Sequence, residues 1–314
     1  MRANRRSETA LSGADSFRRM ETKKIAVLYL CRYANPPQAS RKFLKSLLRF
    51  RAGADFELVY ILKGFPEGTT DPALAHLRNR LPCPVSEVRV SDEFFMINAL
   101  LEGAAQIPHE FIFPLSSWSY ILADNWLGMF VSAFERVPGC VVAGATGSYD
   151  DYFNKGRFPN VHLRTTAFLI DRKTFLAIDD PRRLRTKLDN YHFESGPNGM
   201  TRQLLAKGKV VVVGKDGRSW LPEEWPQSRT LFSGQQENLL IADNQTQIYE
   251  FARFNQRRYM AKNACGDESF AQPPGFARRV RRFFQQTPLK LRKAFGKWRH
   301  RSIHENPSPS GIQN

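Results

Sequence analysis

The feature that most constrains the fold is a regular alternation of short apolar runs and helix-like segments between residues 24 and 147. Runs such as KIAVLYL and FELVYIL are rich in branched and aromatic residues, as strands buried on both faces of a sheet are. The segments between them have helical periodicity and are about 10 to 15 residues long, which suits crossovers between parallel strands. The alternation therefore predicts an α/β fold with a mostly parallel sheet, right-handed crossovers and flanking helices.

The expected elements follow one another with short turns between them. Strands are predicted over 24–30, 56–62, 85–90, 110–113, 139–147, 162–170 and 209–214. Helices are predicted over 36–50, 71–81, 93–107, 123–137, 171–178, 197–208 and about 236–258. Residues 1–22 are polar, basic and without periodicity, so we expect disorder there. We therefore expect the folded domain to span 23–262, followed by a basic amphipathic tail over 263–314.

The formal net charge of +17 lies mostly at the two ends of the chain. Ten Lys and Arg residues and no acids occur between Gly275 and Ser302, and the first 24 residues carry seven Lys and Arg against three acids. The central part is almost balanced, which argues against a folded domain that binds nucleic acid. In the tail, Phe276, Phe283 and Trp298 recur among the cations, a pattern typical of a helix lying in an anionic membrane surface. Partner binding, a solvated helix and nucleic-acid binding are the alternatives for the tail.

No apolar run approaches the roughly 20 residues that a membrane-spanning helix needs. We therefore expect a cytoplasmic protein that is peripheral at the inner face of the plasma membrane. Four cysteines lie far apart without a CxxC pair, so neither a disulfide nor a zinc site is expected. The patterns GxGxxG, GxxxxGK[ST] and GxSxG are also absent.

Ligands of open parallel sheets bind at the carboxyl ends of the strands. Four predicted strand ends are candidates, and they are residues 31–33, 63–65, 116–119 and 145–147. Taken alone, the last of these, in GATGSYD, reads as a plain turn.

The order of four segments resembles bacterial glycosyltransferase-like proteins of the GT-A fold, in the broad family-2 lineage. The matching segments are KIAVLYLCRYANP, IFPLSSWSYILADNWLGMF, NVHLRTTAFLIDRKTFLAI and FESGPNGMTRQLLAKGKVVVVG, and they cover residues 24–215. The resemblance implies transfer of a sugar from a nucleotide-sugar donor to a surface-polysaccharide or lipid-linked acceptor. It places the donor beside Arg32, Lys63, Ser116, Ser117, Trp118 and Ser119, and the acceptor beside His162, Arg164 and Arg202.

The main departure from that family concerns its acidic DxD motif. Ser116 and Trp118 stand where the two acids would hold Mg²⁺ or Mn²⁺ against the donor diphosphate. A hydroxyl is a weak ligand for such an ion and an indole is none, so a divalent cofactor is possible but its acids are missing. A metal-independent site needs Arg, Lys or backbone N–H groups instead, and Arg32, Lys63 and Arg164 are the candidates, with solvated surface cations as the alternative.

Glu194 is the catalytic candidate that the resemblance implies. In FESGPNG it precedes the helix expected near Pro197, and it corresponds to the family's general base for an inverting displacement. The alternative is a carboxylate that stabilises a helix N-terminus.

Several other residues have two interpretations. His162 and His192 are structural or functional, the Asp150–Asp151 pair is a solvated turn or a displaced metal site, and Trp118, Trp220 and Trp225 stack on sugars or cap the core. For the whole chain, the alternative to a transferase is a non-catalytic protein that uses the same fold to bind a glycan or a partner.

Overall fold

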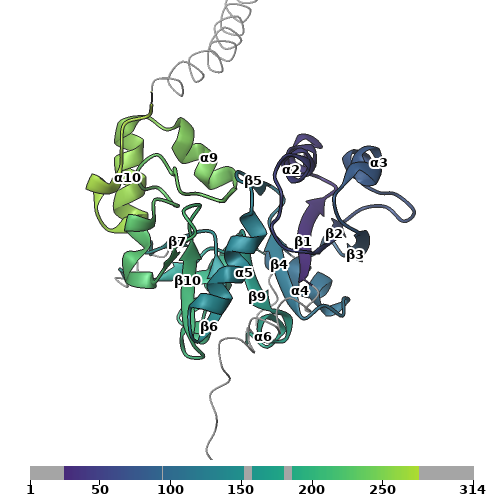
Figure 1. The fold of residues 1–314 in the computed structure, drawn as a ribbon, viewed down its shortest axis with the longest axis horizontal. Coiled ribbons are helices and arrows are strands. Elements are labelled where there is room, and N and C mark those ends of the chain that lie inside the picture. Colours follow the sequence, from purple (N-terminus) through teal and green to yellow (C-terminus); the bar gives the residue numbers. More distant parts are fainter. Residues whose placement is uncertain (1–24, 94, 152–157, 180–185, 276–314) are drawn as a thin grey trace, which may run out of the picture.

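The computed structural model describes residues 25–93, 95–151, 158–179 and 186–275 (Figure 1). Its centre is an eight-stranded sheet with the order β11-β10-β6-β9-β4-β1-β2-β3. The strands are β1 (Ile25–Arg32), β2 (Glu57–Lys63), β3 (Val85–Val90), β4 (Phe111–Leu115), β6 (Cys140–Gly144), β9 (Phe168–Asp171), β10 (Lys209–Val213) and β11 (Ser219–Trp220). Only the pairings of β9 and β11 are antiparallel, so the expected mostly parallel α/β sheet is confirmed.

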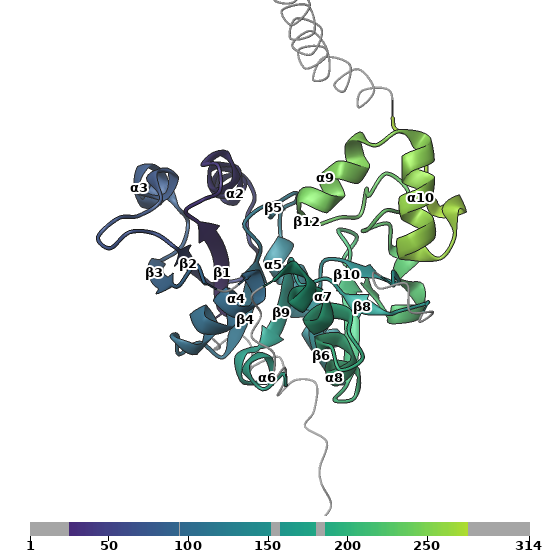
Figure 2. The same cartoon turned by 180° about the vertical axis from the view of Figure 1, so that it is seen from behind.

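Helices cover both faces of this sheet, as Figures 1 and 2 show. They are α2 (Gln38–Arg49), α3 (Pro72–Leu77), α4 (Met96–Ala105), α5 (Trp126–Arg136), α6 (Arg172–Leu176), α7 (Lys187–Ser195), α8 (Met200–Leu205), α9 (Asn244–Phe251) and α10 (Phe254–Cys265). Short 3₁₀ turns span Arg78–Arg80, Pro222–Ser228 and Glu268–Phe270.

Strand β1 shows why the sheet is buried on both sides. Val27 and Tyr29 belong to one core with α2, α3 and α5, whereas Ala26 and Leu28 belong to a second core with α4, α6, α7 and α8. Because successive side chains of a strand point to opposite faces, a continuous apolar run fills both cores. This is the reason that the strand reads as uninterrupted apolar sequence.

Most predicted elements are present with shifted ends. The predicted strand 85–90 coincides with β3, and α2 lies within the predicted helix 36–50. Helix α3 begins at Pro72 and is capped by Asp71, which accepts a hydrogen bond from the Leu74 N–H.

Two predictions are wrong. The strand expected over 162–170 is divided: β8 (His162–Leu163) pairs with β7 (Gly147–Ser148) outside the main sheet, and a turn precedes β9. The single helix expected over about 236–258 is also divided, because β12 (Ile241–Ala242) pairs with β5 (Tyr120–Ile121) and the chain becomes extended at Ala252, between α9 and α10. Helix α10 continues beyond 262, the expected end of the domain.

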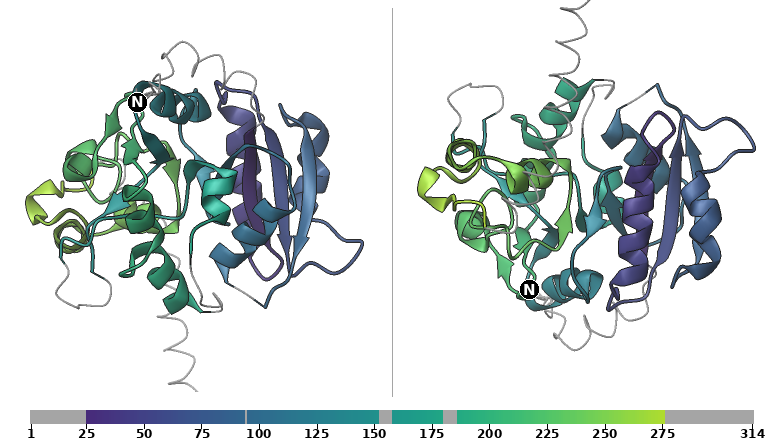
Figure 3. Two further views of the ribbon diagram at one scale, coloured as in Figure 1. Left: turned by 90° about the horizontal axis from the view of Figure 1, so that it is seen from below. Right: turned by 90° about the horizontal axis from the view of Figure 1, so that it is seen from above.

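The order of strands fixes where a ligand site is expected. From β1 the chain builds β2 and β3 on one side and then crosses to place β4 on the other side of β1. Such a reversal leaves a crevice outside the carboxyl ends of the two strands, where α/β proteins bind ligands. In Figure 3, the view from above shows α2 and the α9–α10 region at this end of the sheet.

Candidate functional site

A cavity of about 460 Å³ lies at this reversal of strand order. The residues that line it include Tyr29, Cys31, Tyr33, Ser40, Phe65, Asp71 and Ser117. Its walls are fixed by two buried tyrosines: Tyr29 donates a hydrogen bond to the Ser117 carbonyl at 2.7 Å, and Tyr60 donates to Asp71 at 2.7 Å. The cavity thus joins the end of β1 to the loop that follows β4.

Two aromatic rings stand at the mouth of this cavity. Tyr33 and Phe65 meet edge to face, with 5.3 Å between ring centroids, and the Tyr33 side chain is 61% exposed. A flat ring with one accessible face is suited to stacking on a nucleobase.

Arg32 and Lys63, two predicted donor-binding cations, converge on Asp92, which follows β3. Arg32 bonds both carboxylate oxygens, with Nε–Oδ1 at 2.8 Å and Nη2–Oδ2 at 2.9 Å, and Lys63 Nζ contacts Oδ1. The hydrogen bond from Arg32, together with Lys63, lowers the pKa of Asp92 from 3.8 to about 2. The alternative of a solvated surface cation is wrong for Lys63, whose side chain is only 4% exposed.

The loop Ser116–Ser119 is held by its own hydroxyl groups. Ser116 Oγ and Ser119 Oγ lie 2.8 Å apart, and Ser119 Oγ also donates to the Thr166 carbonyl at 3.0 Å. Trp118 is 40% exposed. The nearest carboxylate along the chain, Asp124, accepts the Arg51 N–H instead.

This donor set does not fit a divalent metal ion, because hard dications need carboxylate or carbonyl oxygens rather than paired hydroxyls. Among residues 25–93, 95–151, 158–179 and 186–275, no group of three or more His, Cys, Asp or Glu side chains is arranged to hold a metal.

Glu194 lies in the last turn of α7, a helix that the sequence analysis did not predict. The suggestion that it stabilises a helix N-terminus is therefore wrong. Its Oε2 accepts hydrogen bonds from both the N–H and the hydroxyl of Thr165, at 2.6 and 2.5 Å. The side chain is 14% exposed, so a carboxylate with one anchored oxygen is held in a nearly dry position.

His162 faces the other oxygen of Glu194. Its Nδ1 lies 2.7 Å from the Asn160 carbonyl, which only accepts, so Nδ1 carries a proton. Its Nε2 lies 3.3 Å from Asp150 Oδ1 and 3.9 Å from Glu194 Oε1. Burial raises the pKa of Asp150, and the negative charge of Glu194 raises it further against the effect of His162.

The β7–β8 hairpin that carries His162 depends on close packing at Gly147. A Cβ at Gly147 would lie 2.2 Å from Cε3 of the Trp225 ring, so only glycine fits there. Trp225 and Trp220 are buried, and the Trp225 indole donates to the Trp220 carbonyl at 3.0 Å. Both tryptophans are core residues, which overturns sugar stacking as their role.

Arg164 forms the second half of this cluster. Its Nη2 lies 2.8 Å from Asp243 Oδ2, with the two side chains 13% and 3% exposed. Burial lowers the pKa of Arg164, but Asp243, Glu194 and Asp150 together raise it above its usual value. Asp243 also caps α9 by accepting the Thr246 N–H at 2.8 Å.

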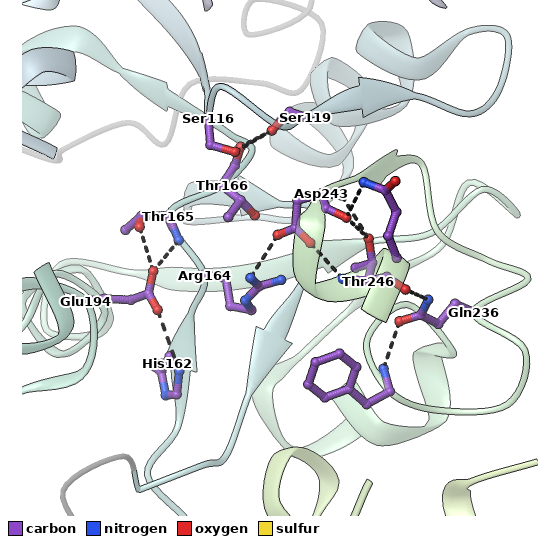
Figure 4. Close-up of polar contacts among 12 residues, drawn as sticks. Ser116, Ser119, His162, Arg164, Thr165, Thr166, Glu194, Gln236, Asp243 and Thr246 are labelled. Atoms are coloured by element: carbon purple, nitrogen blue, oxygen red, sulfur yellow. Dashed lines mark hydrogen bonds and ion pairs between the residues drawn. The ribbon is translucent and has the colours of Figure 1, made fainter. Parts of the chain in front are cut away.

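The turn Thr165–Thr166 joins the predicted donor and acceptor sides (Figure 4). Thr165 holds Glu194, whereas the Thr166 carbonyl accepts from the Ser116 N–H at 3.1 Å and from Ser119 Oγ. Arg202 is attached less directly, through Asn160 Oδ1 at 3.3 Å. The structure thus brings together Ser116, Ser119, His162, Arg164 and Glu194, and it leaves Arg32 and Lys63 in a separate cluster.

Asp92, Thr165 and Asp243 were missed by the sequence analysis. Asp92 follows the predicted strand 85–90, so its place at a strand end could have marked it as a candidate ligand-binding residue. Asp243 lies inside the helix that was wrongly expected to be continuous, so nothing marked it.

No protein-family model matches this chain, and no curated protein matches it in sequence. Matches among solved structures include the S. aureus protein TarS (TM-score 0.42, 14% identity), covering 66% of this chain and 38% of TarS. The mannosyltransferase PcManGT from Pyrobaculum calidifontis, in complex with GDP-Man and Mn²⁺, has a TM-score of 0.43 and 11% identity over 69% of this chain and 66% of its own. Mouse xyloside xylosyltransferase 1 has a TM-score of 0.37 and 14% identity over 59% and 80% of the two chains. This chain thus spans well under half of TarS, and likeness at this level transfers no activity.

Proposed function

We propose that this protein transfers a sugar from a nucleotide-sugar donor to an acceptor hydroxyl, with Glu194 as the general base. The observation that carries the proposal is the Thr165–Thr166 turn. Thr165 holds the Glu194 carboxylate, and the Thr166 carbonyl holds the Ser116–Ser119 loop. That loop lines the cavity at the reversal of strand order through Ser117. The proposed general base, Glu194, and the ligand cavity are therefore joined through the same Thr165–Thr166 turn.

The proposed reaction is a single inverting displacement. The acceptor hydroxyl gives its proton to Glu194 Oε1 while its oxygen bonds to the anomeric carbon of the donor sugar. The bond from that carbon to the nucleoside diphosphate breaks, and the electron pair leaves with the diphosphate. Since Thr165 already holds Oε2, the Glu194 side chain is fixed before the acceptor binds. Positioning Oε1 as the proton acceptor therefore requires no further ordering of that side chain.

The nucleoside is assigned to the cavity beside Tyr33 and Phe65. The charge of the leaving diphosphate needs cations or N–H donors, because the Ser116–Ser119 loop does not fit a metal ion. Arg32 and Lys63 carry two positive charges against the single charge of Asp92, which leaves an excess for an anion. We assign the donor phosphates to this cluster and the acceptor to the side of His162, Arg164 and Arg202.

The acceptor class, a surface-polysaccharide or lipid-linked glycan, stays a proposal from the resemblance. The same holds for a cytoplasmic position at the inner face of the plasma membrane and for binding of the tail to anionic lipid. Residues 276–314, which contain the cationic part of this tail, lie outside the described residues. Within the described residues, no helix is long and apolar enough to cross a membrane.

One observation favours the non-catalytic alternative. Arg32 and Lys63 are already paired with Asp92, and the hydroxyls of Ser116 and Ser119 are already bonded. A protein that only binds a glycan or a partner needs no free cations at this edge.

The test is purified full-length protein incubated with a panel of nucleotide sugars, with and without Mn²⁺. Nucleotide binding is followed by calorimetry, and donor turnover by release of nucleoside diphosphate. We expect binding and slow donor hydrolysis without added metal. Absence of all nucleotide binding would rule out the transferase, whereas binding with no turnover on any acceptor would support the non-catalytic alternative.

A further inference from the structure

Helices α9 and α10 form an open, largely apolar groove of about 800 Å³ on the surface. Six of its lining residues are Gln247, Ile248, Phe251, Gln256, Tyr259 and Met260. The groove is separate from the cavity beside Tyr33, since the two share no lining residue.

Large apolar side chains beside this groove are directed to solvent. Ile248 is 54% exposed and Tyr259 is 70% exposed, and both line the groove. Phe254, in the first turn of α10, is 39% exposed. Gathered exposed groups of this size on a folded domain mark an interaction surface.

The groove adjoins a strongly basic helix. Lys42 of α2 donates a hydrogen bond to Gln247 Oε1 of α9 at 2.8 Å, which links the two helices at this point. Helix α2 carries four cations (Arg41, Lys42, Lys45 and Arg49), all exposed, and no carboxylate. On α10, Lys262 is exposed and follows Tyr259 by three residues, so the two lie on the same side of that helix. Arg253 lies exposed between the two helices.

The basic tail begins beside the same helices. Arg257 of α10 donates to the Gln272 carbonyl at 3.1 Å, so the last described residues pack on α10. The chain continues from Gly275 with ten Lys and Arg residues before Ser302 and no acid among them. In Figures 1 and 2, α2, α9 and the end of the described chain lie at the same end of the molecule.

We propose that the surface formed by α2, α9 and α10 docks the folded domain onto an anionic lipid bilayer. Exposed apolar groups bordered by cations are the pattern of a surface that enters the headgroup region of such a membrane. An amphipathic ring such as that of Tyr259 is favoured at this depth. Each cation near the surface strengthens binding by about fivefold and makes it sensitive to salt.

This docking also orients the domain. The carboxyl ends of β1 and β2, where the cavity lies, point to the end of the molecule that carries α2 (Figure 1). The inference does not depend on sugar transfer, because a binding protein with this surface would dock equally well.

The experiment measures co-sedimentation of the full-length protein with phosphatidylcholine vesicles that contain about 30% phosphatidylglycerol, an anionic lipid. The double variant Ile248→Ser/Tyr259→Ser should bind about tenfold more weakly, because two exposed apolar groups no longer enter the lipid. The matched control is Leu205→Ser on α8, whose side chain is 41% exposed away from this surface, and its binding should be unchanged.

A second variant, Lys45→Gln/Arg49→Gln, separates charge from apolar contact. Its binding should weaken by about tenfold or more at low salt, and the difference from wild type should shrink at high salt. Thermal unfolding and light scattering of every variant check the fold and the oligomeric state. Unchanged vesicle binding in both double variants would overturn the proposal and leave all binding to the tail. Loss of a dimer, with vesicle binding retained, would show that a second copy covers this surface.

Discussion

Two polar clusters lie at the carboxyl edge of the sheet, and they differ mainly in their access to water. In the Arg32–Asp92–Lys63 cluster, the Arg32 and Asp92 side chains are 43% and 41% exposed, and only Lys63, at 4%, is buried. In the cluster of Glu194, His162, Arg164 and Asp243, no side chain is more than 14% exposed.

This difference separates two kinds of task. Charges near water exchange partners at little cost, so the first cluster is suited to releasing Asp92 when an anion arrives. Charges away from water keep their partners, so the second cluster is suited to holding a base in one position. If this division is right, substitutions in the buried cluster have large effects and those in the exposed cluster have small ones.

The largest expected effect is that of Glu194→Gln. Glutamine keeps an oxygen for the Thr165 donors but cannot take a proton, so transfer should fall by about 100- to 10,000-fold. The affinity for the donor should stay within about twofold, because Glu194 is on the acceptor side. The matched control is Glu102→Gln on α4, a helical carboxylate that accepts a hydrogen bond from the Asn98 amide at 2.6 Å. Equal loss of donor affinity and transfer in Glu194→Gln would indicate a structural role instead.

The next largest effect is expected for Asp243→Asn. The amide still accepts the Thr246 N–H at the start of α9, but Arg164 loses its partner in a buried position. Removing one member of a buried pair costs about 3–5 kcal/mol, which would lower the Tm by roughly 10 °C. The free energy of unfolding is measured in urea.

Its control is Glu87→Gln, which breaks the more exposed Arg78–Glu87 pair. That loss should be about 0–1 kcal/mol. Similar losses in the two variants would mean that burial does not distinguish the pairs.

The elements of the sheet were predictable because local sequence determines them. The apolar run of β1 fills two cores at once, and Asp71 followed by Pro72 marks the start of α3 wherever the rest of the chain lies. The candidate site was predictable only in part. The strand ends named Arg32, Lys63 and Ser116, and the resemblance named Glu194.

The contacts that join these residues were not predictable, because they depend on pairings between distant segments. His162 and Leu163 leave the expected strand because β8 pairs with β7, and the helix expected near 241 becomes a strand because β5 offers a partner. Asp243 meets Arg164 only after both rearrangements. No local periodicity encodes such contacts.

A smaller effect is expected for Tyr33→Ala. Stacking of a base on an aromatic ring contributes about 1–3 kcal/mol, so binding of a nucleoside diphosphate should weaken by roughly tenfold. Stability should hardly change, because the ring is largely exposed. The control Tyr259→Ala removes another exposed ring, far along the chain, and should leave nucleotide affinity unchanged. Equal nucleotide affinity in the wild type and both variants would mean that the nucleobase does not stack on Tyr33 and binds elsewhere.

The smallest effect is expected for Asp92→Asn, and its pH dependence tests the exposed cluster directly. The folded pKa of about 2 lies below the ordinary 3.8, so ionised Asp92 stabilises the fold above about pH 4. This contribution is lost as the pH falls from about 4 to 2, when the carboxylate takes up a proton. Since the carboxylate is well exposed, the wild type should exceed the variant by no more than about 1 kcal/mol at pH 7.

The free energies of unfolding of the two proteins, measured in urea at pH 7 and pH 2.5, should therefore approach each other at the lower pH. A difference of several kcal/mol at pH 7, similar to that of Asp243→Asn, would contradict the division between the clusters. It would mean that Asp92 holds Arg32 and Lys63 as rigidly as the buried cluster holds Glu194. Release of these cations to a donor phosphate would then be costly, and the assignment of the phosphates to this cluster would lose its physical basis.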